Sequence, residues 1–267
     1  MQRRRSLIAL ALGATAIAGL ALWLQPPAQP RRAPPQTTPV AAGEITFRPI
    51  GSFQQGGKTV TPPTRKVAVR AFDIMTYQVT GQDYDACVQA GACVAPGVKV
   101  AGSLPQTHVN WKDASAYAAW LSRETGTTWR LPSAEEWQLA AAERFGDAAP
   151  AEDLRDPGQR MLEQYERGIL LRGRVSYGLR PAGGFGTNSQ GVADMAGNVW
   201  EWTDGCIENG TLAHNGRVNS SEPYCGVRIA GGLHPAAVID FVRDAGVGGC
   251  AVGLPPDFLG FRLVRGG

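Results

Sequence analysis

The sequence predicts an α+β fold, a compact mixed domain with little regular secondary structure. The 34 glycines and 19 prolines among 267 residues favour long turns over helical bundles. Three short helices carry their own capping residues, and the C-terminal third consists of short apolar runs between glycines, which indicates short strands and long loops. A chain of this length has room for one sizeable domain with a single hydrophobic core.

The N-terminal segment is typical of export. Arg3, Arg4 and Arg5 precede an uncharged apolar run over residues 7–24, which is the pattern of a signal peptide or signal anchor in residues 1–25. No small-x-small cleavage site follows, so we predict an uncleaved anchor, with cleavage as the alternative. Arg4 and Arg5 also fit a twin-arginine signal, although an ordinary basic leader is the favoured interpretation. The positive-inside rule then places the rest of the chain in the periplasm or another extracytoplasmic space, tethered to the inner membrane.

Residues 26–43 are predicted to form a proline-rich spacer. Val40 is their only long apolar side chain, so the segment lacks the side chains to build a core. The folded domain is therefore expected over residues 44–267, with a charged, weakly patterned surface insertion over residues 146–180 that contains a candidate helix at 159–167.

Helix signals stand out in the first half of the domain, because all three helices have a capping residue at the start and the first two also have a glycine stop. The third helix also has a capping box, in which the Ser133 hydroxyl and the Glu136 carboxylate each accept from a backbone N–H of the other residue. Strands are expected at residues 227–229, 238–242 and 259–264. The predicted helices lie between Thr80 and Gly91, from Trp111 to Arg123 between Asn110 and Gly126, and from Ser133 to about Arg144.

The charge balance argues against nucleic acid as a partner. The formal net charge is +3, but five arginines and no acidic residue precede Glu44. Without those five, 21 basic side chains face 23 acidic ones, which leaves no basic surface for a phosphate backbone.

Four of the five cysteines are predicted to form disulfides, as expected for an exported protein. Cys87 and Cys93 flank the helix stop at Gly91, where the chain reverses and brings their Cα atoms within bridging range. Cys206 and Cys225 bracket a polar loop that a second disulfide would close. Cys250 is then left over, either as a small buried hydrophobe or as a reactive or metal-binding thiol.

The segment from Asp194 to Trp202 is the most specific motif of the chain. Asp194 and Glu201 lie seven residues apart around a glycine turn and could converge with backbone carbonyls into an oxygen site for Ca²⁺. Taken alone, the spacing is weak evidence for a metal site and favours a turn in which Asp194 caps backbone amides while Trp200 and Trp202 pack in the core.

Five ordered motifs resemble the formylglycine-generating, or sulfatase-modifying-factor, family over residues 44–265. The resemblance implies a fold related to C-type lectins, and a structural calcium site formed by the Asp194 and Glu201 side chains with the Gly197 and Val199 carbonyls. The motifs are Thr107-His108-Val109-Asn110-Trp111, Trp129-Arg130-Leu131-Pro132-Ser133-Ala134-Glu135-Glu136-Trp137, the segment from Asp194 to Trp202, Gly231-Gly232, and Leu259-Gly260-Phe261-Arg262.

The chain departs from that family where the catalytic copper would bind. In the oxidases, two cysteines after the glycine pair bind copper(I), but the corresponding positions here hold Ala236 and Phe241. Arg243 keeps an arginine of the family's cleft, whereas Val247 stands where a second arginine is usual. We therefore expect neither bound copper nor formylglycine formation on sulfatases.

A finer resemblance is to the NirV-type accessory proteins found beside copper nitrite reductase. It rests on the segments Cys225-Gly226-Val227-Arg228, Asp240-Phe241-Val242-Arg243-Asp244, Gly249-Cys250-Ala251-Val252-Gly253 and Pro255-Pro256-Asp257.

Three functions follow as hypotheses. The first is an exported accessory or maturation factor that recognises another exported protein or peptide, with copper nitrite reductase as a candidate. The second is a periplasmic oxidoreductase that tailors a peptide or small molecule, and the third is a non-catalytic, calcium-stabilised binding module. His108 is expected to be structural and His214 solvated. The candidate cleft residues are His234, Arg243, Cys250 and Trp200.

Overall fold

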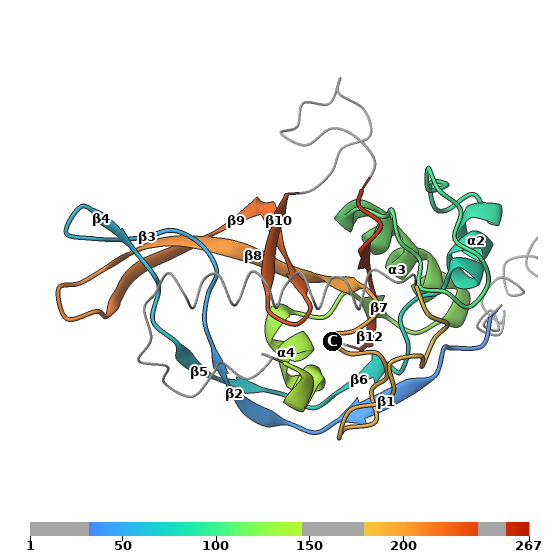
Figure 1. Cartoon of the computed structure of the whole chain (residues 1–267), viewed down its shortest axis with the longest axis horizontal. Helices are drawn as coiled ribbons and strands as arrows, with labels where there is room; N and C mark the ends of the chain where they lie inside the picture. The colour runs from blue at the N-terminus through green and yellow to red at the C-terminus, as the bar shows by residue number, and fades with distance from the viewer. Residues whose placement is uncertain (1–31, 146–178, 240–254, 267) are drawn as a thin grey trace, which may run out of the picture.

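The computed structural model describes residues 32–145, 179–239 and 255–266 (Figure 1). The predicted anchor, the candidate helix at 159–167, and the residues Phe241, Arg243 and Cys250 lie outside the described residues. Among the described residues, no helix has the length and apolar character that crossing a membrane requires.

All three predicted helices are confirmed, with their caps. Thr80, Asn110 and Ser133 are the N-caps, and each forms a capping box with the third residue of its helix. The second helix ends at Gly126, whose left-handed backbone suits glycine. The third is shorter than predicted, because its last turn, Ala142–Arg144, is a 3-10 helix. The helices are α2 (Gly81–Gln89), α3 (Trp111–Thr125) and α4 (Ala134–Ala141).

The strands form three small sheets. One has the order β1-β6-β12-β7, a second has the order β10-β9-β8-β3-β4 with β11 added in parallel to β8, and a third pairs β2 with β5. The strands are β1 (Thr37–Val40), β2 (Gly43–Phe47), β3 (Phe53–Gln55), β4 (Lys58–Val60), β5 (Arg65–Val69), β6 (Phe72–Met75), β7 (Trp129–Arg130), β8 (Trp200–Leu212), β9 (Val218–Gly231), β10 (Ala236–Ile239), β11 (Leu259–Gly260) and β12 (Val264–Arg265).

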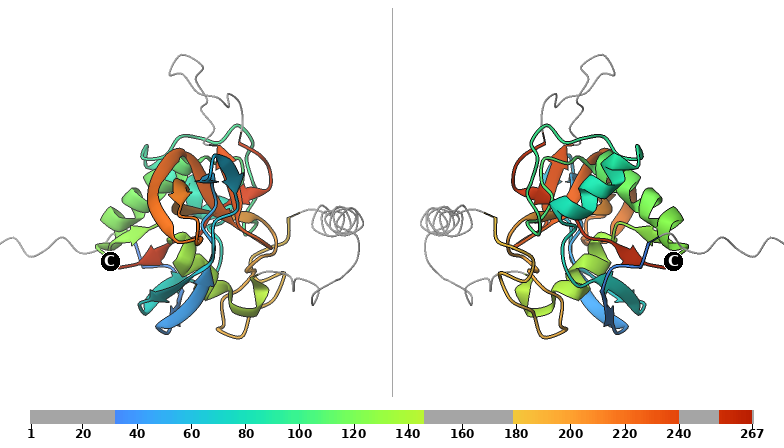
Figure 2. Two further views of the ribbon diagram at one scale, coloured as in Figure 1. Left: turned by 90° about the vertical axis from the view of Figure 1, so that its left-hand side faces the viewer. Right: turned by 90° about the vertical axis from the view of Figure 1, so that its right-hand side faces the viewer.

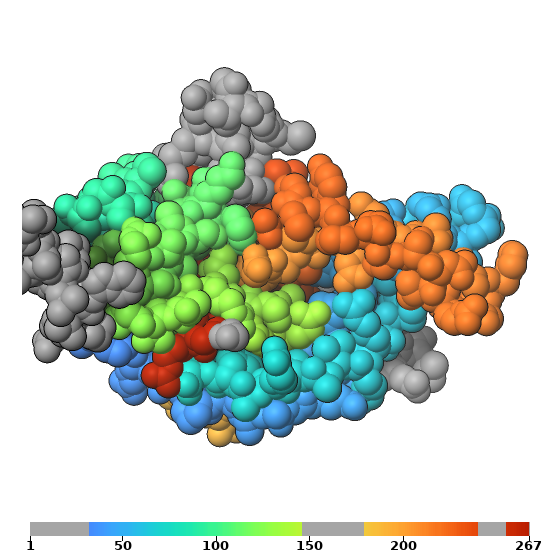
Figure 3. Space-filling model, turned by 180° about the vertical axis from the view of Figure 1, so that it is seen from behind, coloured from blue at the N-terminus to red at the C-terminus, as the bar shows by residue number. Residues whose placement is uncertain are grey.

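The segment between Cys206 and Cys225 is not the polar loop that the sequence predicted. Most of it belongs to β8 and β9, which pair antiparallel as a long hairpin arm that projects from the body (Figures 1 and 3). The prediction was wrong because few side chains along the outer arm are buried, so apolar and polar residues do not alternate there. The views of Figure 2 show this arm at one end of the molecule and α2 and α3 at the other.

The predicted boundary between spacer and domain was also wrong, since the fold begins before residue 44. β1 pairs antiparallel with β6, and Val40 is 2% exposed within the core. Pro39 is tolerated because β1 is an edge strand. Further back, Arg32 forms an ion pair with Asp83 at 3.0 Å. A single large apolar side chain was enough to anchor this strand.

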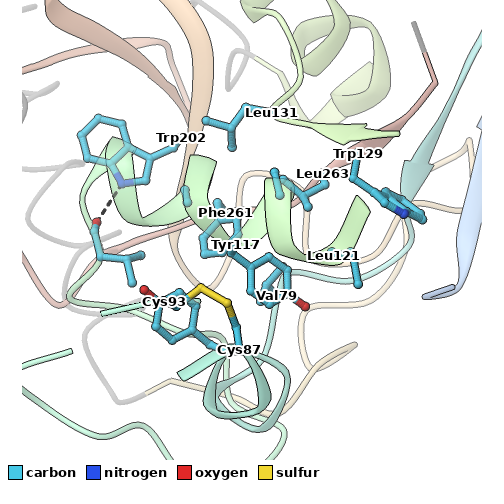
Figure 4. Close-up of a cluster of buried hydrophobic side chains, with 14 of the residues drawn as sticks. Val79, Cys87, Cys93, Tyr117, Leu121, Trp129, Leu131, Trp202, Phe261 and Leu263 are labelled. Atoms are coloured by element: carbon cyan, nitrogen blue, oxygen red, sulfur yellow. Dashed lines mark hydrogen bonds between the residues drawn. A yellow bond between two sulfur atoms is a disulfide. The ribbon is translucent and has the colours of Figure 1, made fainter. Parts of the chain in front are cut away.

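The largest core cluster lies between α2 and α3 and the strands around β8. Tyr117 and Phe261 pack edge to face at its centre, and Trp202 donates its indole N–H to the Val109 carbonyl at 2.9 Å (Figure 4). The glycine pair lets two tryptophan rings approach the backbone closely. A Cβ on Gly231 would lie 2.2 Å from the ring of Trp137, and one on Gly232 would lie 2.7 Å from the ring of Trp200.

Both predicted disulfides are confirmed. Cys87 and Cys93 join the end of α2 to the following loop, and Cys206 and Cys225 join the two strands of the hairpin arm. Two disulfides in one domain indicate an oxidising, extracytoplasmic compartment.

Candidate functional site

The start of β8 presents two different environments, because successive side chains of a strand point to opposite faces. Glu201 is fully buried on one face, and Trp200 and Trp202 lie on the other. The first face forms a buried polar centre, made by Glu201, Arg262, Gln78 and Trp137. The second leads to the aromatic surface, made by Trp111, Arg228, Trp200, His234 and Val238.

The Glu201–Arg262 ion pair is the core of the buried polar centre. Arg262 Nε lies 2.6 Å from Glu201 Oε2 and Nη2 lies 2.8 Å from Oε1, a two-point contact between side chains that are both 0% exposed. The indole N–H of Trp137 donates to Oε2 at 2.9 Å. This carboxylate is therefore neutralised and held in place.

Arg262 uses all five of its N–H donors. Besides the two on Glu201, three go to the backbone carbonyls of Met75, Thr76 and Ala193, at 3.2, 3.1 and 2.8 Å. One side chain thus joins the end of β6, the loop before the Asp194 motif, and β8. A buried charge needs such complete pairing to be tolerated.

Three of the four oxygens predicted for calcium converge on one atom of the protein. Gln78 Nε2 donates to Glu201 Oε1 at 2.8 Å, to the Gly197 carbonyl at 3.2 Å and, at 3.5 Å, to the Val199 carbonyl. A nitrogen that carries two hydrogens therefore lies where these oxygens meet.

The fourth predicted calcium ligand is engaged elsewhere. The Asp194 carboxylate accepts from the backbone N–H of Gly183 at 2.6 Å and of Phe185 at 2.8 Å. In the part of the chain that the structure describes, no group of three or more His, Cys, Asp or Glu side chains is placed to hold a metal ion. The donor set, as these residues arrange it, does not fit Ca²⁺ at the Gln78 position. Calcium binding stays a prediction, which the experiments below address.

The aromatic surface brings together two of the four predicted cleft residues. Trp200 and the exposed His234 stack edge to face, with ring centroids 4.8 Å apart. Trp111, at the start of α3, lies beneath Arg228, whose guanidinium carbon is 3.7 Å from the ring centroid. Trp111, Trp200 and Val238 are all partly buried against the same core cluster.

The aromatic surface is held in shape by hydrogen bonds. Trp111 donates its indole N–H to the Thr203 carbonyl at 3.1 Å, and Arg228 donates to the Asp204 carbonyl at 3.2 Å. Arg228 Nη1 also lies 3.2 Å from the Sγ of Cys206 in the arm disulfide. Trp111 and Arg228 therefore keep fixed positions at the base of the hairpin arm.

The roles of several residues in these two sites were not predicted from the sequence. Trp137 and Arg262 were in the quoted motifs, but only as markers of the family, and Gln78 was not singled out. A buried glutamate that needs a cationic partner was the one available hint of Arg262. Ala236, where the family resemblance predicts an alanine in place of a cysteine, lies in β10 opposite Ala230 and is half-buried at the edge of the second sheet.

Comparison with known proteins places the chain in a family. The model of the sulfatase-modifying factor enzyme 1-like domain matches residues 25–266. The chain belongs to this family. The predicted fold is also confirmed. The fold is similar to the solved structure of PvdO from Pseudomonas aeruginosa, with a TM-score of 0.56 and 21% identity over 86% of this chain and 94% of that chain.

Curated relatives of this sulfatase-modifying-factor domain differ in what their names state. The inactive C-alpha-formylglycine-generating enzyme 2 of Mus musculus is 37% identical over 113 residues, 40% of this chain and 34% of that protein. The formylglycine-generating enzyme of Thermomonospora curvata is 26% identical over 232 residues, 65% and 73% of the two chains. Hercynine oxygenase of Mycolicibacterium thermoresistibile is 36% identical over 109 residues, which are 37% of this chain and 20% of that protein. The match thus spans about a third of the mouse relative's length.

Proposed function

We propose that this sulfatase-modifying-factor domain is an exported accessory protein that recognises a segment of another exported protein through the aromatic surface. The observation that carries the proposal is the pairing of Trp111 with Arg228 and of Trp200 with His234. Recognition rather than oxidation is the activity that these side chains serve.

The chemistry of the aromatic surface suits binding. Tryptophan and arginine are enriched among the residues that contribute most to protein interfaces. Because Trp111 and Arg228 already hold each other, binding would cost little side-chain entropy. Their partner would be a peptide segment with an apolar side chain for the tryptophans and a carbonyl or carboxylate for Arg228.

The residues after the glycine pair support a function without copper. Copper(I) needs soft thiolate ligands, and Ala236 and Phe241 supply none. The similarity to the inactive C-alpha-formylglycine-generating enzyme 2 of Mus musculus supports a role without that oxidation.

The place and partner follow from the sequence. An anchor over residues 7–24 would hold the domain at the outer face of the inner membrane, in the periplasm. The resemblance to NirV-type proteins makes copper nitrite reductase the first partner to test.

The test is a binding measurement on the full chain in detergent, with purified copper nitrite reductase and an unrelated exported protein as the two ligands. The expected result is saturable binding to the reductase alone, weakened at least about tenfold by Trp200→Ala and by Trp111→Ala, since loss of a hot-spot side chain costs about 2 kcal/mol or more. Tyr224→Ala is the matched control, because Tyr224 is an exposed aromatic side chain on the hairpin arm. Equal loss in all three variants, or no binding by the wild type, would contradict the proposal.

A second candidate function rests on His234, a titratable and exposed group beside Trp200. The chain would then be an oxidoreductase acting on a peptide or small molecule, with hercynine oxygenase as the relative that favours this reading. Oxygen consumption with candidate substrates, abolished by His234→Ala, would favour it over recognition. Binding without oxygen consumption would favour the accessory role.

A further inference from the structure

Two carbonyls of the turn before β8 and the Glu201 carboxylate within β8 direct three oxygens at one point, and a side-chain amide fills that point. We propose that Gln78 takes the place of a cation here, so that the domain keeps its shape without Ca²⁺. Gln78 is 3% exposed and comes from the segment between β6 and α2, which is far from the turn in sequence. The amide thus joins two distant parts of the chain, as a bound ion would.

The oxygens converge because of the backbone conformation of the turn. Asp194, Ala196 and Asn198 all have positive φ, at 57°, 54° and 64°. A left-handed residue between Gly197 and Val199 turns both of their carbonyls toward Gln78. For non-glycine residues this conformation is uncommon, so other contacts must hold it.

Hydrogen bonds within the protein hold this turn at each end. Asn198 donates to the Arg180 carbonyl at 2.8 Å and accepts from the Arg180 N–H at 3.0 Å. At the other end, the Asp194 carboxylate accepts from the N–H groups of Gly183 and Phe185. Every side chain that a cation would otherwise have to organise already has a partner.

The charge of the centre is balanced without an ion. Glu201 carries one negative charge, and Arg262 neutralises it through two contacts in a fully buried site. A divalent ion at the Gln78 position would bring two more positive charges close to the guanidinium, in a region where charges are poorly screened. A neutral amide that donates hydrogen bonds avoids this repulsion.

The orientation of the amide follows from its partners. All three are acceptors, so Nε2 must face them, and the oxygen would be repelled there. Gln78 Oε1 consequently lies buried and has no hydrogen-bond partner within the described part of the chain. Rotating the amide would direct Oε1 at the three oxygens, which is favourable only with a cation between them. With Nε2 facing the three oxygens, the amide therefore excludes a cation from this point.

The test compares the unfolding temperature of the full chain in EDTA and in millimolar CaCl2, with bound calcium measured by elemental analysis. The wild type is expected to unfold at the same temperature in both buffers and to hold no stoichiometric calcium. Gln78→Glu would place a second carboxylate against Glu201, so its unfolding temperature should fall by about 5 °C or more in EDTA and recover in CaCl2. Gln138→Glu is the matched control, because Gln138 donates to the Thr46 carbonyl on an exposed part of α4. It should show no calcium response.

Should Gln78→Glu fail to fold in either buffer, Gln78→Met keeps the side-chain volume and removes the donors. Its unfolding temperature should be lower than that of the wild type in EDTA. A wild type that is stabilised several degrees by Ca²⁺, or that holds one calcium per chain, would overturn the proposal. Wild-type stability of Gln78→Met in EDTA would also overturn it, since the amide would then hold nothing. Neither readout depends on partner binding, so failure here leaves the proposed function standing.

Discussion

The two faces at the start of β8 differ in how deeply their side chains are buried. On the inner face, Glu201 and Arg262 are fully buried, and each charged atom has a protein partner. On the outer face, His234 is exposed, and Trp200 and Trp111 are only partly buried. One backbone segment thus serves a closed network on one side and an open surface on the other.

The difference between the faces shows how a fold can be kept while its chemistry changes. The inner face ties the Asp194 motif, β6 and the C-terminal Arg262 together, so it preserves the family's architecture. The outer face carries Trp200 and His234, which take no part in that network, so its side chains can change without disturbing it. Function belongs to sites on a fold rather than to the fold itself. The inner face should therefore determine stability, and the outer face should determine binding.

The largest effect is expected from Arg262→Met. Removing one partner of a buried ion pair leaves an unpaired charge, which costs about 3–5 kcal/mol. Urea unfolding of the wild type and of Arg262→Met measures this loss in the free energy of unfolding. Arg265→Met is the matched control, because Arg265 is a half-exposed arginine three residues later that pairs with Asp73. That pair should contribute less than about 1 kcal/mol. Similar losses in both variants would remove the distinction between the buried centre and the surface.

A smaller effect is expected from Trp137→Phe, which removes the indole N–H that donates to Glu201. The buried Glu201 carboxylate would lose one hydrogen-bond donor, at a cost of about 1–3 kcal/mol in the free energy of unfolding. Trp120→Phe is the control. The Trp120 indole N–H is buried and has no partner among the described residues, so its removal should be close to neutral. A larger loss at Trp120 than at Trp137 would contradict the hydrogen-bond account.

A pH-dependent effect is expected from Glu136, on α4. Burial would raise the pKa of its carboxyl, but two hydrogen bonds from Arg130 at 2.7 Å, the Ser133 N–H and the arginine charge outweigh burial and lower the pKa below 4.5. A lowered pKa in the folded state means that the stabilisation is complete above pH 4.5 and is lost as the pH falls through the folded value. Glu136→Gln should reduce stability by about 1 kcal/mol at neutral pH.

The free energy of unfolding of wild type and Glu136→Gln, measured from neutral to acidic pH, checks this prediction. The difference between the two proteins should shrink on acidification. Glu135→Gln, a neighbouring carboxylate 3.7 Å from Arg65, should show little change across the same range. A difference that grows toward low pH would have the wrong sign.

The smallest effect on stability is expected from His234→Ala. The ring is exposed and contacts the edge of Trp200, so truncation should change the free energy of unfolding by no more than about 0.5 kcal/mol. Thermal unfolding measures it. A loss comparable to that of Trp137→Phe would mean that the outer face is structural as well.

Local signals made the helices and disulfides predictable. Thr80, Asn110 and Ser133 sit next to the backbone groups they cap, and Cys87 and Cys93 are separated by a single chain reversal. The hairpin arm was missed because its strands are exposed and lack alternation. β1 was missed because a proline-rich segment rarely forms a strand, and this one does so only at a sheet edge.

The buried polar centre could not be predicted because its contacts are distant in sequence. Glu201 meets Arg262 from 61 residues away, Trp137 from 64 and Gln78 from 123. The sequence identified two carboxylates and their carbonyls, yet it contained no sign that a glutamine side chain would lie among them. Only the packing of β6, α4 and the C-terminus brings these groups together.

The most direct test of the account is the dissociation constant of the full chain for copper nitrite reductase, measured for wild type and His234→Ala under the same conditions. His234 touches the aromatic surface and contributes little to stability, so a change in affinity reports on recognition alone. The account predicts at least about a tenfold weaker complex with an unchanged unfolding temperature. An unchanged dissociation constant would contradict the claim that this face recognises the partner.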